Sequence, residues 1–69
     1  YEFGNCDCTI CAEAPKLNPH VPAMINCLAE VMYVSEGQIS IKATTTEKLG
    51  FVGREEGIAA QAVVLLTEK

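Results

Sequence analysis

Residues 42–57 read Lys-Ala-Thr-Thr-Thr-Glu-Lys-Leu-Gly-Phe-Val-Gly-Arg-Glu-Glu-Gly and join two apolar patterns. Before this stretch, apolar and polar residues alternate, which predicts a strand at residues 38–43. From Arg54, near its end, the pattern predicts a helix that continues to the end of the chain. A fold does not need so many polar groups at a strand-to-helix junction. Backbone N–H groups and hydroxyls there can bind phosphate, and a nearby carboxylate can hold a divalent cation.

The same stretch also has a purely structural interpretation. Thr44 and Glu47 have the spacing of a capping box, in which the threonine caps a helix and the glutamate reaches back. Gly50 and Gly53 would then be turn residues in a loop over residues 44–53. Because short motifs match by chance, residue chemistry alone slightly favours this structural interpretation and leaves phosphate binding open.

Upstream, residues 3–12 alternate imperfectly between apolar and polar side chains, which predicts another strand. A helix is predicted to start at Asn18 and Pro19, with the asparagine as its cap and the proline at its first position. Its apolar face has residues at helical spacing. They are Val21, Met24, Ile25, Leu28, Val31 and Met32.

The last predicted helix places acidic residues in its first turn and Lys69 in its last, as the helix dipole favours. Its apolar face comprises Ile58, Ala62, Leu65 and Leu66. The predicted order is therefore strand, helix, strand, helix. Such an order predicts an α/β (α+β) fold with a sheet backed by helices.

Length and charge limit the functions that this chain can have. Its 69 residues make one domain at most, and 49% of them are apolar, so we expect surfaces that are buried against other subunits or a further part of the protein. The net charge of −4 argues against nucleic-acid binding, which needs many cations. We expect no membrane association, since no signal peptide is visible and no apolar run approaches about 20 residues.

The first predicted strand contains Cys6, Cys8 and Cys11, whereas Cys27 and His20 lie further along. Cys8 and Cys11 form a CxxC pair, but a zinc site would need a second pair at comparable spacing. Alternation places Cys6 and Cys8 on one side of the strand and Cys11 on the other. We therefore predict core cysteines. A small structural-metal or redox domain is the alternative.

Residues 42–51, followed by Gly53-Arg54 and Glu56-Gly57, resemble the C-terminal signature of the 2-C-methyl-D-erythritol 2,4-cyclodiphosphate synthases. A second motif agrees with it in order and spacing: Gly4-Asn5, Asp7, Thr9, Ala12-x-Ala14-Pro15-Lys16 and Pro19-His20-x-Pro22-x-Met24. The resemblance covers essentially the whole chain. It implies that residues 1–69 are the C-terminal part of a single synthase domain with a mixed, helix-backed sheet, and that the whole protein is a homotrimer.

The resemblance also implies a set of contacts to the cytidine and phosphates of a CDP-linked substrate. These residues are Ala12, Glu13, Ala14, Pro15, Lys16, Leu17, Asn18, Thr44, Thr45, Thr46, Glu47, Phe51 and Arg54. Thr45 would be the catalytic residue, because its hydroxyl would steady the α-phosphate as charge builds. Glu47 would hold magnesium or manganese together with the phosphates. Phe51 and Arg54 would face a cavity between subunits that binds an isoprenoid diphosphate.

By the same resemblance, the whole enzyme belongs to the non-mevalonate isoprenoid pathway and cyclises 4-diphosphocytidyl-2-C-methyl-D-erythritol 2-phosphate with loss of CMP. It would use zinc as well as magnesium or manganese, but the family's zinc ligands are absent from this chain. We therefore expect the segment alone to be inactive. The expected location is the bacterial cytoplasm, or the plastid in a eukaryote. The alternative function is a non-catalytic module that binds a nucleotide or an isoprenoid diphosphate.

Overall fold

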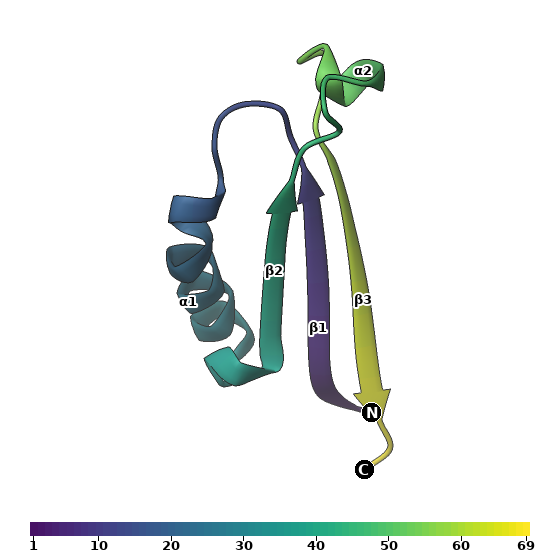
Figure 1. Cartoon of the computed structure of the whole chain (residues 1–69). Helices are drawn as coiled ribbons and strands as arrows, with labels where there is room; N and C mark the ends of the chain where they lie inside the picture. Colours follow the sequence, from purple (N-terminus) through teal and green to yellow (C-terminus); the bar gives the residue numbers. More distant parts are fainter.

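The structure is a computed structural model that describes residues 1–69. Its elements are β1 (Glu2–Cys11), η1 (Asn18–His20), α1 (Val21–Met32), η2 (Glu36–Gln38), β2 (Ile39–Thr44), α2 (Gly50–Gly53) and β3 (Ala59–Thr67). The strands form one sheet in the order β2-β1-β3. Figure 1 shows α1 beside β2, the short α2 beyond the end of β2, and both termini at the opposite end of the sheet.

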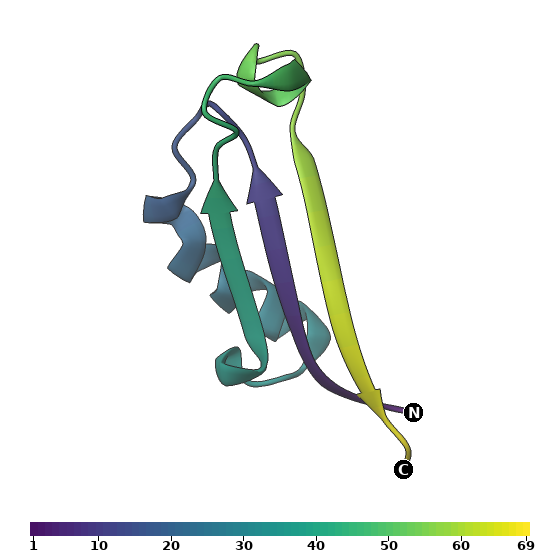
Figure 2. The same cartoon turned by 45° about the vertical axis from the view of Figure 1, so that its right-hand side comes forward.

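The sheet is mixed, as the family resemblance implied. β1 and β2 run parallel, in a register from Cys6 with Ile39 to Cys11 with Thr44. β1 and β3 run antiparallel along their whole length, with one irregularity between Phe3 and Asn5. Because β1 and β2 are parallel, their carboxyl ends meet at the same edge of the sheet. The loops that follow these two strands therefore lie side by side, as the rotated view in Figure 2 also shows.

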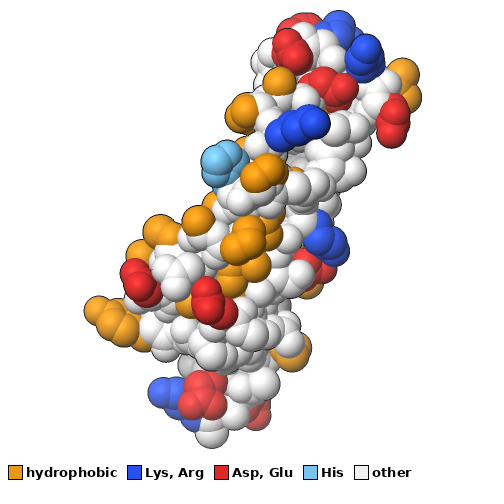
Figure 3. Space-filling view, turned by 60° about the vertical axis from the view of Figure 1, so that its left-hand side comes forward, with side chains coloured by type: hydrophobic (Ala, Val, Ile, Leu, Met, Phe, Trp, Pro, Cys, Tyr) orange, Lys and Arg blue, Asp and Glu red, His pale blue; other side chains and the backbone are white.

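The core lies between α1 and the two parallel strands. Its buried cluster consists of Cys6, Ala29, Ile39 and Ile41, and partly buried residues of β1 and α1 pack against it. The alternation of β2 places Ile39 and Ile41 on the face that α1 covers, with Ser40 and Lys42 exposed. Apolar side chains also remain visible on the outside of the helix-bearing side of the molecule in Figure 3.

The start of the first helix differs from the prediction. α1 begins at Val21, and Asn18 opens the preceding 3₁₀ turn without capping a helix through its side chain. The packed face is also narrower than predicted. Val21, Met24, Ile25 and the buried Ala29 contact the core, whereas Leu28, Val31 and Met32 are exposed. The predicted face was too wide, because the sheet contacts only one side of α1.

The predicted C-terminal helix is wrong, because residues 59–67 form β3. Glu55 has a positive φ of 61° and ends the turn after α2, so no helix begins at Arg54. The free edge of β1 offers a full row of backbone donors and acceptors, which β3 pairs from Ala59 to Thr67. The order is thus strand, helix, strand, short helix, strand.

The predicted core position is correct for two of the three cysteines in β1. Cys6 is in the core and Cys8 packs against it, but Cys11 lies half-buried outside this cluster, so its predicted core position is wrong. Burial, with Cys8 nearby, raises the pKa of the Cys6 thiol, which keeps it protonated at neutral pH. All four cysteines are free thiols.

No helix in the structure has the length and apolar character needed to cross a membrane.

Candidate functional site

An open pocket of about 400 Å³ lies at the carboxyl edge of β1 and β2. Two segments far apart in the sequence form it: the loop between β1 and η1, and the end of β2. Its lining consists of Ala12, Glu13, Pro15, Lys16, Leu17, Asn18, Pro19, Ala43, Thr44 and Thr45. Most of the residues that the sequence predicted for a cytidine and phosphate site therefore share one pocket.

The pocket does not include every predicted residue. Ala14, Thr46, Glu47, Phe51 and Arg54 do not line it. Conversely, two lining residues were missed by the sequence analysis, Pro19 and Ala43. Both directly adjoin predicted residues, and Ala43 lies at this edge of the sheet because it pairs with Ile10 in the parallel register.

A backbone hydrogen bond holds the two segments together. The Ala12 N–H donates to the Thr44 carbonyl at 3.0 Å, which extends the parallel ladder by one residue into the loops. Ala12 is buried, whereas Thr44 is exposed at the end of β2. The β1–η1 loop then leaves the sheet through a cis Ala14–Pro15 peptide bond. The ladder thus sets the spacing between the two walls of the pocket.

The β1–η1 loop contains two side chains of opposite charge that line the pocket, Glu13 and Lys16. Lys16 is exposed and lines the pocket, where its ammonium group can attract a phosphate. Glu13 also lines the pocket, and its Oε2 atom is buried without a hydrogen-bond partner. A buried acceptor without a donor is costly. The pocket can therefore satisfy Glu13 when it receives a group that donates a hydrogen bond.

The threonines after β2 make local hydrogen bonds with different roles. The Glu47 N–H donates to Thr45 Oγ1 at 3.2 Å, which leaves the Thr45 hydroxyl hydrogen free to donate into the pocket. Thr44 Oγ1 lies 3.4 Å from the Thr45 carbonyl oxygen. The predicted capping box between Thr44 and Glu47 is absent, since Glu47 and Lys48 both have positive φ and form a turn instead of a helix start.

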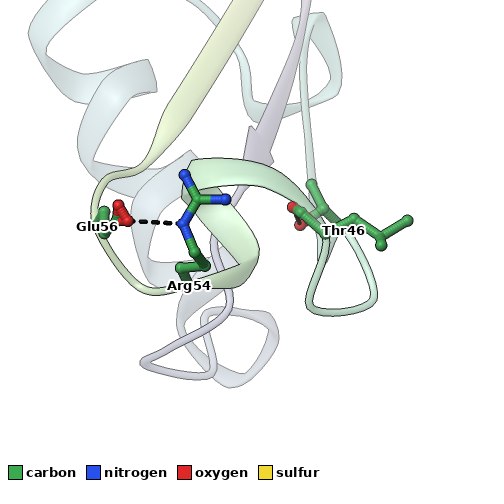
Figure 4. A network of polar contacts seen from close by, with 4 residues as sticks. Thr46, Arg54 and Glu56 are labelled. Atoms are coloured by element: carbon green, nitrogen blue, oxygen red, sulfur yellow. Dashed lines mark hydrogen bonds and ion pairs between the residues drawn. The ribbon is translucent and has the colours of Figure 1, made fainter.

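The segment after this turn carries Phe51 and Arg54 away from the pocket. Phe51 is 52% exposed on α2, and its ring lies next to Gly57. Arg54 Nε donates to Glu56 Oε2 at 2.7 Å, as Figure 4 shows. Both side chains of this ion pair are largely solvent-exposed, so Arg54 can readily leave Glu56 and pair with another anion. The geometry therefore separates these two residues from the Thr45 region.

A second ion pair lies on the sheet face opposite α1. Lys42 Nζ donates to Asp7 Oδ2 at 2.9 Å and links β2 to β1. The hydrogen bond from Lys42, together with its charge, holds the pKa of Asp7 below its usual range. Because both side chains are largely exposed, this pair fixes the two strands only weakly.

The chain offers few groups for a metal ion. No three His, Cys, Asp or Glu side chains gather in a metal-binding cluster, so the residues present do not form a zinc site. Glu47 suits a different role. Its carboxylate makes no ion pair, and the residue lies two positions after Thr45. Magnesium is often held by one carboxylate together with substrate phosphates.

Known proteins resemble this chain over nearly its whole length. The model of the YgbB family matches residues 1–67. The 2-C-methyl-D-erythritol 2,4-cyclodiphosphate synthase of Parabacteroides distasonis is 68% identical over 96% of this chain, which spans 41% of that protein. The solved synthase of Plasmodium vivax superposes with a TM-score of 0.93 and 34% identity, over 97% of this chain and 45% of that one.

A solved structure from Plasmodium falciparum, described as a CDP complex, has a TM-score of 0.88 and 33% identity to this chain. It covers 91% of this chain, which spans 40% of its length. The chain thus spans less than half the length of these proteins. From the family match and these similarities together, we conclude that this chain belongs to the YgbB family.

Proposed function

We propose that the whole protein containing this chain is a 2-C-methyl-D-erythritol 2,4-cyclodiphosphate synthase and that residues 1–69 form the C-terminal part of its single domain. The observation that carries this proposal is the pocket that joins the β1–η1 loop to Thr44 and Thr45. Its two walls differ in chemistry, as a nucleotide requires. One wall offers loop backbone and apolar surface to a base, and the other offers hydroxyls to phosphates.

The residues have separate roles in this proposal. The loop from Ala12 to Asn18 receives the cytosine end of the substrate, with Lys16 near its negative charge. Glu13 Oε2, which has no partner in the structure, accepts a hydrogen bond from the bound substrate. Thr44 and Thr45 donate to the phosphates. Thr45 is the catalytic residue, because its hydroxyl meets charge that develops on the α-phosphate during the reaction.

The reaction is an intramolecular displacement. An oxygen of the substrate's 2-phosphate forms a bond to the β-phosphorus, while the bond from that phosphorus to the oxygen bridging the α-phosphate breaks. CMP leaves with the bridging oxygen, and the product retains both phosphates in a ring. Since no protein nucleophile is consumed, the protein needs only to align the two phosphates and stabilise the negative charge. The pocket residues can do both.

Metal ions enter this proposal in a limited way. Glu47 is the residue of this chain that would hold magnesium or manganese, which would neutralise charge on the phosphates. The chain contains no set of residues for zinc, so we assign no step to zinc here. The Glu47 backbone contributes independently, because its N–H donates a hydrogen bond to Thr45 Oγ1 and fixes the position of that oxygen.

We further propose that the whole protein is a homotrimer in which Phe51 and Arg54 of the subunits surround a common cavity. Phe51 is half-exposed and Arg54 has only a surface ion pair, so both are free to meet another subunit. A cavity with an apolar ring and a guanidinium group suits an isoprenoid diphosphate. Light scattering of the whole protein should give three times the subunit mass.

The decisive experiment measures CMP release from the CDP-linked diphosphate substrate by the purified whole protein. We expect turnover that is lost with Thr45→Ala, and no turnover by the 69-residue chain alone. As a control, Ser40→Ala changes a hydroxyl at an exposed position of β2 outside this pocket. If the whole protein bound CDP but released no CMP, the proposal would be wrong, and a non-catalytic nucleotide-binding module would replace it.

A further inference from the structure

We infer that Thr46 and Gly53 are positioning residues, which close the loop after β2 and thereby set Thr45 and Glu47, and that Thr46 does not contact the substrate. This inference rests on the proposed function and deepens it. Thr46 stands in the middle of three threonines and a glutamate, so the sequence suggests a phosphate contact. Its place in the structure argues for a different role, because it does not line the pocket.

The hydroxyl of Thr46 is already engaged within the loop. Thr46 Oγ1 donates to the Leu49 carbonyl at 2.7 Å, and the Leu49 N–H donates back to the Thr46 carbonyl at 3.1 Å. These two bonds join the same pair of residues across the turn at Glu47 and Lys48. The Thr46 side chain is half-buried, while its neighbours Thr45 and Glu47 are exposed. Its hydroxyl therefore serves the backbone of the loop.

Gly53 closes the other end of the same turn. Its N–H donates to the Leu49 carbonyl at 3.1 Å, so this carbonyl oxygen accepts from both Thr46 and Gly53. A Cβ atom at position 53 would lie only 2.7 Å from the Lys48 carbonyl oxygen and would overlap the carbonyl carbon. Since the obstacle is backbone, a larger residue would force the turn to move. Only glycine permits this close approach.

Positive φ angles make the turn depend on these contacts. Glu47 has a φ of 55° and Lys48 a φ of 65°, a conformation that costs free energy for residues with side chains. The bonds from Thr46 and Gly53 hold the strained turn in place. Within it, the Glu47 N–H fixes Thr45 Oγ1. A relaxed turn would release this bond and move both the catalytic hydroxyl and the carboxylate.

The Arg54–Glu56 ion pair does not explain how the loop after β2 is held in its conformation. Figure 4 shows it on one side of α2, with Thr46 on the other. Both of its side chains are largely exposed, so the pair contributes little free energy. The closure is therefore assigned to the two bonds on the Leu49 carbonyl and to the close contact of Gly53 with Lys48.

The test uses Thr46→Val and Gly53→Ala in the whole protein. We expect kcat to fall about 10-fold for Thr46→Val and about 100-fold for Gly53→Ala, since a misplacement near 1 Å can cost this much. Thr46→Ser keeps the hydroxyl and should restore kcat to within about two-fold. Hydrogen exchange without ligand should become faster at the Leu49 and Gly53 amides in Thr46→Val. The double variant should lose less activity than the product of the two single effects.

Gly37→Ala is a matched control, because a Cβ at position 37 meets nothing within 4 Å. Unchanged amide exchange in Thr46→Val would overturn the inference, as would failure of Thr46→Ser to restore activity. Loss of activity that merely followed a lower Tm would overturn it too. The exchange measurement needs no turnover, so it tests the inference even if the wild-type protein released no CMP. That last result would instead contradict the proposed function.

Discussion

β2 and β3 flank the same central strand but have opposite surroundings. β2 pairs with β1 in parallel and is covered by α1, so that Ile39 is only 5% exposed. β3 pairs with β1 over more residues, yet Val63 is 73% exposed and no β3 residue is buried. The extent of backbone pairing therefore does not explain the difference in burial, since the more extensively paired strand is the more exposed one. What separates them is the helix that covers one and not the other.

This contrast indicates which strand has a second layer packed on its apolar side chains and which strand lacks one. A sheet buries apolar residues only where a second layer packs on it, and α1 supplies that layer for β2. The exposed run from Val63 to Leu66 has no such layer in this chain. We expect another part of the whole protein or a second subunit to cover it. β2 also leads directly into the pocket, whereas β3 ends far from it.

The largest expected effect tests the functional side of this contrast. In the whole protein, Thr45→Ala at the end of β2 should lower kcat about 100-fold, by analogy with the loss of a donor to a developing oxyanion. CDP affinity should change much less, because the hydroxyl acts mainly in the transition state. Steady-state kinetics and calorimetry measure the two effects.

Thr67→Ala is the matched change at the end of β3 and should leave kcat within about two-fold, since surface substitutions are usually mild. Equal losses in CDP binding and turnover for Thr45→Ala would make Thr45 a ground-state contact only. Similar kinetic losses for the two variants would remove the functional distinction between the strands.

The next effect concerns stability in the 69-residue chain. Ile39→Ala should lower the free energy of unfolding by about 2–4 kcal/mol, because it leaves a cavity in the core. Val63→Ala should change it by less than about 0.5 kcal/mol, because that side chain is already exposed. Urea denaturation followed by circular dichroism compares the two. Equal costs would show that β3 is packed in solution and would contradict its exposed state.

The contrast also explains what the sequence could predict about the fold. The alternation in residues 39–43 marks one buried face, so β2 was readily predicted. Residues 59–67 form a nearly continuous apolar run, which by periodicity alone can be a helix or a strand. Val63 and Val64 favoured a strand, but acidic residues upstream resembled a helix start. The open edge of β1 decided the outcome, and no local pattern reports it.

The candidate site was predictable in part for a related reason. The two loops carry distinctive motifs, but their proximity depends on the parallel register of β1 with β2. Thr46 shows the limit of residue chemistry: it has the same hydroxyl as Thr45, yet its bond to the Leu49 carbonyl turns it away from the pocket lining. Which threonine points where is set by the strained turn at Glu47 and Lys48.

A smaller effect tests whether β3 has a cover. In the whole protein, Leu65→Ala should lower the free energy of unfolding by about 1–2 kcal/mol, the worth of a partly buried leucine. In the 69-residue chain, the same substitution should cost much less, since Leu65 is exposed there. Thermal unfolding of the four proteins gives the difference. The expected cover would be excluded if Leu65→Ala were equally mild in both chain lengths.

The smallest effect is the pH dependence of the exposed ion pair that links β1 to β2. Lys42 lowers the pKa of Asp7 in the folded protein, relative to about 3.9 in an unfolded chain. The ionised pair therefore adds stability above that value, and this contribution is lost as the pH falls through the lower folded pKa. Lys42→Met should raise the pKa of Asp7 in an NMR titration. It should destabilise the protein slightly at pH 7, and this effect should disappear as the pH falls through the folded pKa of Asp7. Gln61→Met provides a control on β3, because Gln61 pairs with Thr9 and carries no charge. If the Asp7 titration were the same with and without Lys42, the pair would not persist in solution, and only the backbone ladder and the core would join the two parallel strands.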